Sequence, residues 1–374
     1  MPNPRQNDPV IDEFKAWLTM LTTGDGSDLH LKVGSPPMIR RETLLHRLDR
    51  EPVSPEETDV IAAFCVPEER QKRLADKGEV DFAYSLPGTG RYRVNAFKQR
   101  GSTSFVFRRM GIGGKEFEDL GIPDVVRNLA DESRGLVLVT GPTGSGKTTT
   151  LAGIIEHINR TRAVHIVTVE DPIEVLHHDK QASINQREVG QDTESFLTAL
   201  RAALRQDPDV ILIGEMRDTE TVRTALQAAE TGHLVFSTLH TVDAMETVNR
   251  VVDFFPPHQQ IQIRLTLAGA LRGIVSQRLV PAVDGGLIPS VEILVNTGRI
   301  QERIADPKLT AEIHEVMKEG GYYGMMTFDQ HLLQLVGSGQ VEITDAMKSS
   351  TNPHDFQLML QQSGLLEAGT SIVR

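Results

Sequence analysis

The chain has 374 residues, of which 39% are apolar and 24% are charged, a composition typical of folded globular proteins and unlike that of disordered ones. Lys and Arg number 39 against 51 Asp and Glu, so the formal net charge is −12. Proteins that bind nucleic acid usually carry a basic surplus, so we expect no nucleic acid as the main partner. At roughly 150 residues per domain, the length predicts two or three domains.

The single cysteine, Cys65, excludes an intrachain disulfide and a zinc site of the CxxC type. Residues 1–15 mix acidic and basic side chains without an apolar segment, so the sequence predicts no signal peptide. No apolar run approaches the ~20 residues that a membrane-spanning helix needs. Together these features predict a cytoplasmic protein of several domains.

The first 110 residues are expected to form a domain that mixes helices and strands. Phe14, Leu18 and Leu21 have the spacing of one helical face, and the apolar stripe of residues 55–74 predicts a second helix. Pro55 suits the first turn of that helix, where its missing N–H costs no hydrogen bond.

Two candidate strands, residues 81–84 and 91–97, are separated by a turn sequence rich in Pro and Gly, which predicts a β-hairpin. A further strand is expected over residues 104–108. Three glycines then follow within four residues, a composition typical of linkers. We therefore predict an N-terminal domain over residues 1–110 and an interdomain linker over residues 111–118.

The rest of the chain, residues 119–374, is expected to be a second, larger domain. Continuous apolar runs without polar alternation are typical of parallel strands that are buried on both faces and covered by helices. Four such runs occur, at residues 136–140, 163–169, 210–213 and 234–238. From about residue 261 we expect mostly helix, with a hairpin near Asp284-Gly285-Gly286 and a helical C-terminal part over about residues 300–374.

A P-loop follows the first of these runs and predicts ATP as the ligand, because it fits the pattern G-x-x-x-x-G-K-[ST] between a strand and a helix. Its glycines allow backbone N–H groups to point at phosphate oxygens, and the helix adds its positive N-terminal end. Lys147 is expected to reach the β- and γ-phosphates, and Thr148 to bind Mg²⁺. The predicted nucleotide-binding residues are Gly141, Pro142, Thr143, Gly144, Ser145, Gly146, Lys147, Thr148 and Thr149.

Acidic and histidine residues lie at the ends of the other apolar runs. A P-loop enzyme needs an acidic group for the Mg²⁺ shell and a group that orients the attacking water. Glu215 and the cluster that ends in Glu174 supply carboxylates, although such a cluster can also be a solvated turn. His233 and His240 flank the fourth run, where a histidine can equally be a structural hydrogen-bond donor.

These motifs, in this order, resemble the secretion ATPase superfamily and, within it, the type IV pilus retraction (twitching motility) ATPases of the PilT and PilU kind. The resemblance covers nearly the whole chain and implies a PAS-like α+β N-terminal domain, a RecA-like α/β P-loop motor domain and a hexameric ring with ATP at the subunit interfaces. The motifs that carry it are residues 27–31, 91–97, the P-loop, 169–174, 185–189, 214–218 and 231–240.

The resemblance also implies roles for single residues. Glu174 is similar to the catalytic glutamate that orients or activates water, and Glu215 to the Walker B acid that supports Mg²⁺ through water. His233 and His240 would link the nucleotide to the neighbouring domain. Three arginines on the N-terminal strands would face the nucleotide of a neighbouring subunit, although any one could be an ordinary solvated side chain; they are Arg91, Arg93 and Arg108.

The function implied is an ATP-hydrolysing hexameric motor that powers pilus retraction from the cytoplasmic face of the inner membrane. Its expected partners are further copies of the chain, an inner-membrane pilus platform protein and a paralogous retraction ATPase. Pilus-assembly and type II secretion ATPases have similar motor motifs, but they generally carry an additional N-terminal region, and many carry a four-cysteine metal module. The short N-terminal part and the single cysteine therefore favour retraction.

One segment departs from the retraction pattern. Where ATPases of the PilT kind carry a sequence resembling Ala-Ile-Arg-Asn-Leu-Ile-Arg-Glu, residues 299–306 retain only the isoleucines and an acidic end. The segment 294–297 is more similar to the PilU kind, so an accessory paralogue stays an alternative. Two remoter alternatives are a RecA-type nucleic-acid motor, disfavoured by the charge, and a nucleotide-gated scaffold that does not hydrolyse ATP, disfavoured by the intact acidic motifs.

Overall fold

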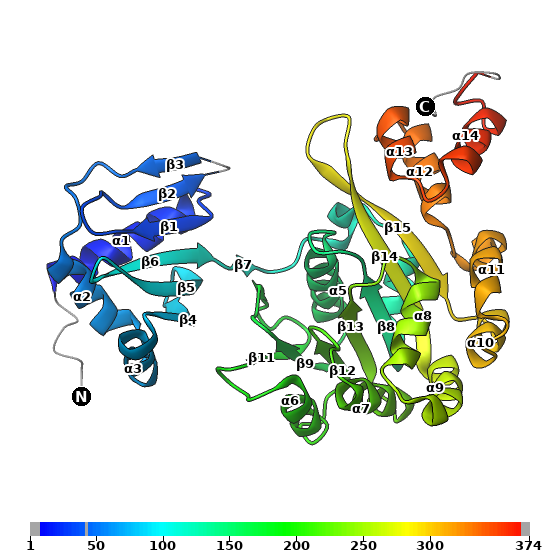
Figure 1. The fold of residues 1–374 in the computed structure, drawn as a ribbon, viewed down its shortest axis with the longest axis horizontal. Helices are drawn as coiled ribbons and strands as arrows, with labels where there is room; N and C mark the ends of the chain where they lie inside the picture. The colour runs from blue at the N-terminus through cyan, green and yellow to red at the C-terminus, as the bar shows by residue number, and fades with distance from the viewer. Residues whose placement is uncertain (1–7, 42–43, 368–374) are drawn as a thin grey trace. The chain divides into compact units, whose positions relative to one another are not determined.

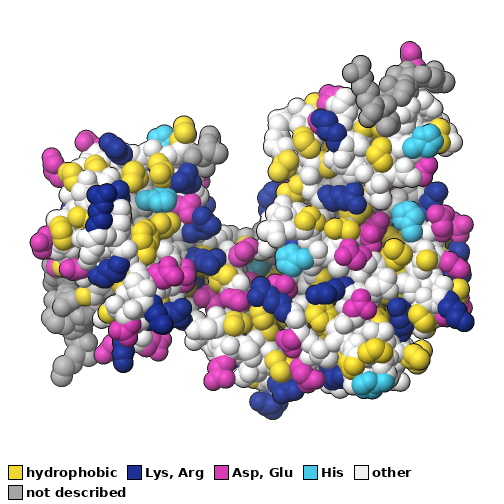
Figure 2. Space-filling model, viewed as in Figure 1, with side chains coloured by type: hydrophobic (Ala, Val, Ile, Leu, Met, Phe, Trp, Pro, Cys, Tyr) yellow, Lys and Arg dark blue, Asp and Glu magenta, His cyan; other side chains and the backbone are white. Residues whose placement is uncertain are grey.

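The computed structural model describes residues 8–41 and 44–367. Within the chain, Met1–Ile112 and Gly113–Arg374 form two compact units. The linker expected over residues 111–118 spans this division, and its role as a joint stays a prediction. Lys and Arg side chains are interspersed with Asp and Glu over the visible face of each unit, so neither unit presents a continuous basic surface in that view (Figure 2).

The first unit is built on a six-stranded antiparallel sheet in the order β3-β2-β1-β6-β5-β4. The hairpin predicted from the Pro- and Gly-rich turn is confirmed, because β4 pairs with β5 around it. The strands are β1 (Asp28–Leu31), β2 (Met38–Arg41), β3 (Leu44–Arg47), β4 (Glu79–Leu86), β5 (Gly90–Gln99) and β6 (Ser102–Arg109). Strands β2 and β3 were not predicted, since both are short and β3 is exposed throughout.

Helix α1 (Pro9–Thr23) covers the core of this sheet with the predicted apolar face. The Asp8 side chain accepts a hydrogen bond from the Val10 N–H and caps the helix start. The second predicted helix, residues 55–74, is wrong as a single element: it is divided into α2 (Pro55–Cys65) and α3 (Glu68–Lys77). Pro67 causes the break, because it lacks an N–H and forces the preceding Val66 into an extended conformation.

The second unit contains a seven-stranded sheet in the order β11-β9-β12-β13-β8-β14-β15. All neighbouring strands are parallel except β14 and β15, which pair antiparallel. The four apolar runs are confirmed as strands of this sheet. The strands are β8 (Gly135–Thr140), β9 (His165–Glu170), β11 (Ser183–Glu188), β12 (Val210–Ile213), β13 (Leu234–Leu239), β14 (Leu271–Pro281) and β15 (Leu287–Val295), with short strands β7 (Gly111–Ile112) and β10 (Val175–Leu176) elsewhere.

The central strand β8 is buried on both faces, as its apolar sequence predicted. Leu136 and Leu138 enter one core, and Val137 and Val139 enter a second core on the opposite face. The first core also holds helices α6 (Phe196–Ala203), α7 (Thr219–Glu230), α8 (Ala244–Asp253) and α9 (Pro257–Ala270). The second holds α4 (Val125–Ala130), α5 (Lys147–Thr161) and the 3₁₀ turn Phe117–Leu120.

Strands β14 and β15 form the predicted hairpin around Asp284-Gly285-Gly286, but their length contradicts the mostly helical region expected after residue 261. The hairpin extends past the sheet toward the last helices (Figure 1). There Val280 enters a separate core with the last three helices. The helices after it are α10 (Gly298–Ala305), α11 (Ile313–Glu319), α12 (Phe328–Gly337), α13 (Ile343–Ser349) and α14 (Pro353–Gln362), with 3₁₀ turns at Thr310–Glu312 and Gly320–Tyr323.

The predicted fold class is confirmed: an α+β N-terminal unit precedes an α/β P-loop unit that ends in helices. In the described ranges, no helix combines the length and the apolar character that crossing a membrane requires.

Candidate active site

A cleft of about 590 Å³ lies in the second unit, at the edge where its parallel strands end. Because the carboxyl ends of parallel strands share one edge, the segments after β8, β9, β12 and β13 meet there. The cleft residues from the last positions of these strands and from the segments after them are Thr143 to Thr149, Glu170, Asp171, Pro172, Glu174, Gly214, Glu215, Arg217, Thr238 and His240. Leu151, Ala152, Val175, His177, Phe196, Leu212 and Leu279 complete the walls.

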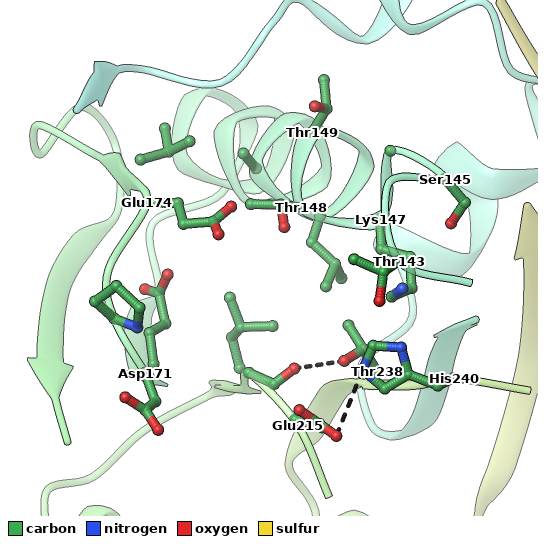
Figure 3. A pocket seen from close by; sticks show the side chains of 18 of the residues that line it. Thr143, Ser145, Lys147, Thr148, Thr149, Asp171, Glu174, Glu215, Thr238 and His240 are labelled. Carbon is green, nitrogen blue, oxygen red and sulfur yellow. Dashed lines mark hydrogen bonds and ion pairs between the residues drawn. The ribbon is translucent and has the colours of Figure 1, made fainter. Parts of the chain in front are cut away.

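The P-loop forms one wall of this cleft and ends where α5 begins at Lys147. Gly146, the residue before the helix, has φ +90° and offers no side chain to cap it. The first N–H groups of α5 are therefore open to an anion, as in phosphate-binding helices. Thr143, Ser145 and Lys147 lie together near the turn, with Thr148 facing the centre of the cleft (Figure 3).

The Lys147 ammonium folds over its own loop and donates hydrogen bonds to the carbonyl oxygens of Gly141 and Pro142, at 2.7 and 3.0 Å. Burial lowers the pKa of Lys147, and the negative charge of Glu215 partly offsets that effect. Glu215 is therefore close enough to Lys147 to act on it electrostatically.

Glu215 follows β12 and lies on the opposite wall of the cleft from the P-loop (Figure 3). Arg217 binds its Oε2 at 2.8 Å, and the His240 Nε2 lies 3.5 Å from its Oε1. The bond to Glu215 raises the pKa of Arg217. Arg217 was not predicted as a site residue, although it belongs to the same motif as Glu215. Arg217 and His240 thus lie against the carboxylate, and Lys147 is within its electrostatic reach.

Two glutamates at the carboxyl end of β9 line the cleft, Glu170 as the last residue of the strand and Glu174 in the segment after it. Glu174 points toward Thr148 (Figure 3). Glu170 was not singled out from the sequence; burial raises its pKa, and its carboxyl accepts hydrogen bonds from the Thr168 hydroxyl and the Gln186 amide at 2.6 and 3.2 Å. A backbone hydrogen bond from Glu174 also reaches the Glu170 carboxyl. Glu170 therefore holds the segment that presents Glu174.

The two predicted histidines do not lie together. His240 lines the cleft, beside Thr238, whose hydroxyl donates to the Gly214 carbonyl at 2.6 Å. His233 precedes β13 and so lies at the other end of that strand, where its Nδ1 contacts the Ala228 carbonyl at 3.0 Å. A role for His233 at the nucleotide of its own chain is therefore not supported, because the site lies at the carboxyl end of the strand.

The three predicted arginines belong to the first unit, on β5 and β6. Arg93 and Arg108 are directly opposite each other in the register of these strands. Arg108 donates to Asp28 at 2.8 Å and is 68% exposed. Burial by itself would raise the pKa of Asp28. The hydrogen bonds from Arg108 and Ser27 outweigh this effect, and the net result is a lowered pKa. Arg91 lies on the same strand as Arg93, two residues earlier.

A buried carboxyl, Glu292 on β15, holds the segment that follows His240. Its Oε1 accepts from the backbone N–H of Ala244, the first residue of α8, at 2.9 Å. Burial raises the pKa of Glu292 to about 7, and the nearby charges of Asp243 and Asp329 act in the same direction. The hydrogen bond from Ala244 and the charge of Arg278 act in the opposite direction and offset only part of this rise.

Replacing Glu292 by Gln is expected to stabilise the protein against urea more at pH 8 than at pH 5. Between the ordinary pKa of 4.5 and about 7, the folded protein keeps a proton that the unfolded chain loses, so wild-type stability falls as the pH rises. At 1.36 kcal/mol per pH unit, the difference amounts to at most about 3 kcal/mol. Urea unfolding followed by circular dichroism measures it, and a difference between variant and wild type that does not change with pH would contradict the assignment.

The chain is similar to known proteins over most of its length. The family model described as "Type II/IV secretion system protein" matches residues 9–364. The chain is 43% identical to "Type IV pilus retractation ATPase PilT" of Pseudomonas aeruginosa over 330 residues, 88% of this chain and 96% of that protein. It is 39% identical to "Type IV pilus ATPase PilU" of the same organism over 353 residues, 93% of this chain and 91% of that protein.

A solved structure is also similar over both units. The crystal structure of the pilus retraction motor PilT with bound ADP matches with a TM-score of 0.84 and 44% identity, over 94% of this chain and 99% of that one. These matches confirm the predicted resemblance to PilT and PilU. The chain belongs to the type II/IV secretion system protein family and is an ATPase of that family.

Proposed function

We propose that the protein hydrolyses ATP to power retraction of a type IV pilus. The observation that carries the proposal is the cleft itself, where an uncapped helix start and Lys147 face the carboxylates of Glu174 and Glu215. Retraction is favoured because PilT of Pseudomonas aeruginosa, to which the chain is 43% identical, is a pilus retraction ATPase.

The P-loop N–H groups and five cleft side chains have roles in this proposal. The N–H groups of the P-loop and Lys147 bind the phosphates, and Glu174 orients the water that attacks the γ-phosphate. The hydroxyl of Thr148 and, through water, the carboxylate of Glu215 supply hard oxygen ligands of the kind that Mg²⁺ prefers. Bound there, Mg²⁺ would neutralise charge on the β- and γ-phosphates. His240 lies against Glu215 and would respond when that carboxylate changes its partners.

We further propose a homohexamer in which Arg91, Arg93 and Arg108 face the nucleotide of a neighbouring subunit. The register supports this role, because it places Arg93 and Arg108 opposite each other, and the Arg108 side chain stays 68% exposed although it is paired with Asp28. Guanidinium groups also match phosphate oxygens in geometry and stay charged. The ring would act at the cytoplasmic face of the inner membrane, against a pilus platform protein, and a paralogous retraction ATPase is a further expected partner.

A chromosomal Lys147→Ala substitution in the native host is expected to increase surface pilin and abolish twitching. Without the ammonium that binds the phosphates, pili would be built but not withdrawn. Sheared surface pilin, quantified against the wild type, measures the effect. A loss of pilin would mean that the protein builds pili, and this outcome would overturn the proposal.

A second candidate function is that of an accessory paralogue of the PilU kind. The match to PilU extends over 93% of the chain, more than the match to PilT. The divergent segment 299–306, now seen to form most of α10 and the residue after it, also favours this candidate. Unchanged pilin and motility in the Lys147→Ala strain, together with a defect once the principal retraction ATPase is disabled, would select it.

A further inference from the structure

Strand β14 continues beyond its neighbour β8 at the point where the P-loop begins. Ser276 is opposite Thr140, the last residue of β8, and the Thr140 hydroxyl donates to the Ser276 hydroxyl at 2.9 Å in the interior. The next residue, Gln277, is still paired with Val291 of β15 on one side, but on the other side, where β8 has ended, it lies beside the P-loop. It is 2% exposed, and no role in nucleotide binding was predicted for it.

Gln277 contacts the P-loop and the helix that follows it at three points. Its side-chain Oε1 accepts a hydrogen bond of 2.8 Å from the hydroxyl of Thr150 on α5, and both groups are buried. Its side-chain Nε2 lies 2.7 Å from the place that a Cβ on Gly146 would occupy. Its backbone carbonyl blocks the corresponding place on Gly141. Gln277 thus packs against the first and last glycines of the loop.

The close packing explains why these two positions must be glycine. Gly141 and Gly146 have φ of +143° and +90°, conformations that other residues rarely adopt. The shape of the P-loop is therefore set from the side by β14, and the first turn of α5 is held in place by the bond from Thr150.

We propose that Gln277 is a positioning residue for nucleotide binding. It contacts the loop rather than the cleft, and it fixes the directions of the N–H groups that must converge on the phosphates. Loss of its amide leaves the Thr150 hydroxyl buried without an acceptor and allows the first turn of α5 to shift. Because binding depends on converging groups, a small displacement of this turn weakens every phosphate contact at once.

The test compares two near-isosteric variants, Gln277→Leu and Thr150→Val, with Thr150→Ser, which keeps the hydroxyl. Gln227→Leu, on the exposed face of α7, is the control. The Kd for ADP and the KM for ATP are expected to rise about tenfold in Gln277→Leu and in Thr150→Val, the effect of a lost buried hydrogen bond. The kcat at saturating ATP should stay within about twofold, and Thr150→Ser should match the wild type.

The double variant Gln277→Leu/Thr150→Val should bind ADP no more weakly than the weaker single variant, because both changes remove the same bond. A lower melting temperature and a lower kcat with unchanged KM and Kd would show a merely structural role and overturn the proposal, as would equal weakening in Thr150→Ser. The inference rests on the proposed ATPase function. A wild type that failed to bind ADP would overturn both, whereas a wild type that binds ADP beside unaffected variants would overturn this inference alone.

Discussion

A Glu174→Gln variant is expected to bind ATP as tightly as the wild type and to hydrolyse it at least about a hundredfold more slowly. Glu174 lines the cleft and points toward Thr148, the residue expected to bind Mg²⁺. An amide of the same size keeps the packing of the segment but can no longer orient or deprotonate water as a carboxylate does. Phosphate release at saturating ATP, together with binding of a fluorescent ATP analogue, separates the two effects.

Glu170→Gln is the matched control for this prediction. Its carboxyl accepts hydrogen bonds from Thr168 and Gln186 at the same oxygen, and a Gln carbonyl can accept both. We therefore expect a rate within about tenfold of the wild type, a small effect for a side chain that only positions others. A larger loss in Glu170→Gln than in Glu174→Gln would reverse the assignment of the two glutamates.

Lys147→Ala is expected to lower the rate of ATP hydrolysis by roughly a hundredfold to a thousandfold, as removal of one transition-state electrostatic contact does. In the structure its ammonium already lies against the P-loop carbonyls of Gly141 and Pro142, within reach of the place where phosphates would bind. Unlike Glu174→Gln, this variant should also bind nucleotide more weakly, because Lys147 is proposed to contact the phosphates of bound ATP before the reaction as well as in the transition state.

The comparison for Lys147→Ala is Lys308→Ala, which removes an exposed lysine after α10 and should leave the rate unchanged. Phosphate release and ADP affinity are measured on both proteins. Full hydrolysis by Lys147→Ala would show that the P-loop lysine is dispensable, and the proposed chemistry would then be wrong.

The parts of the molecule that could be predicted are those whose signal is local. The P-loop has fixed spacing, and the four apolar runs are long enough to indicate buried strands. Because parallel strands end at one edge, the acids after these runs were expected in one place, and Glu174 and Glu215 are found there. His240 follows the same rule, whereas His233 breaks it because it precedes its strand.

The features that were missed depend on tertiary contacts. Nothing near Gln277 in the sequence indicates a contact with a loop that lies about 130 residues earlier. Apolar and polar residues also do not alternate regularly along β14 and β15, so their sequences could not be distinguished from those of helices. Glu170 and Arg217 could have been found, since both lie within predicted motifs and close to strand ends. The break at Pro67 was also readable, because proline inside a helical pattern usually ends it.

The hydrophobic cores described above each draw on residues of one unit alone. A single free energy of unfolding therefore does not describe this protein, because two units with separate hydrophobic cores can unfold separately. A nucleotide that binds the cleft stabilises only the larger unit against unfolding. In the proposed hexamer, the smaller unit would gain heat resistance from the same nucleotide only if a neighbouring subunit presented it to Arg91, Arg93 and Arg108. The melting temperature of the smaller unit would then report whether the proposed ring has formed.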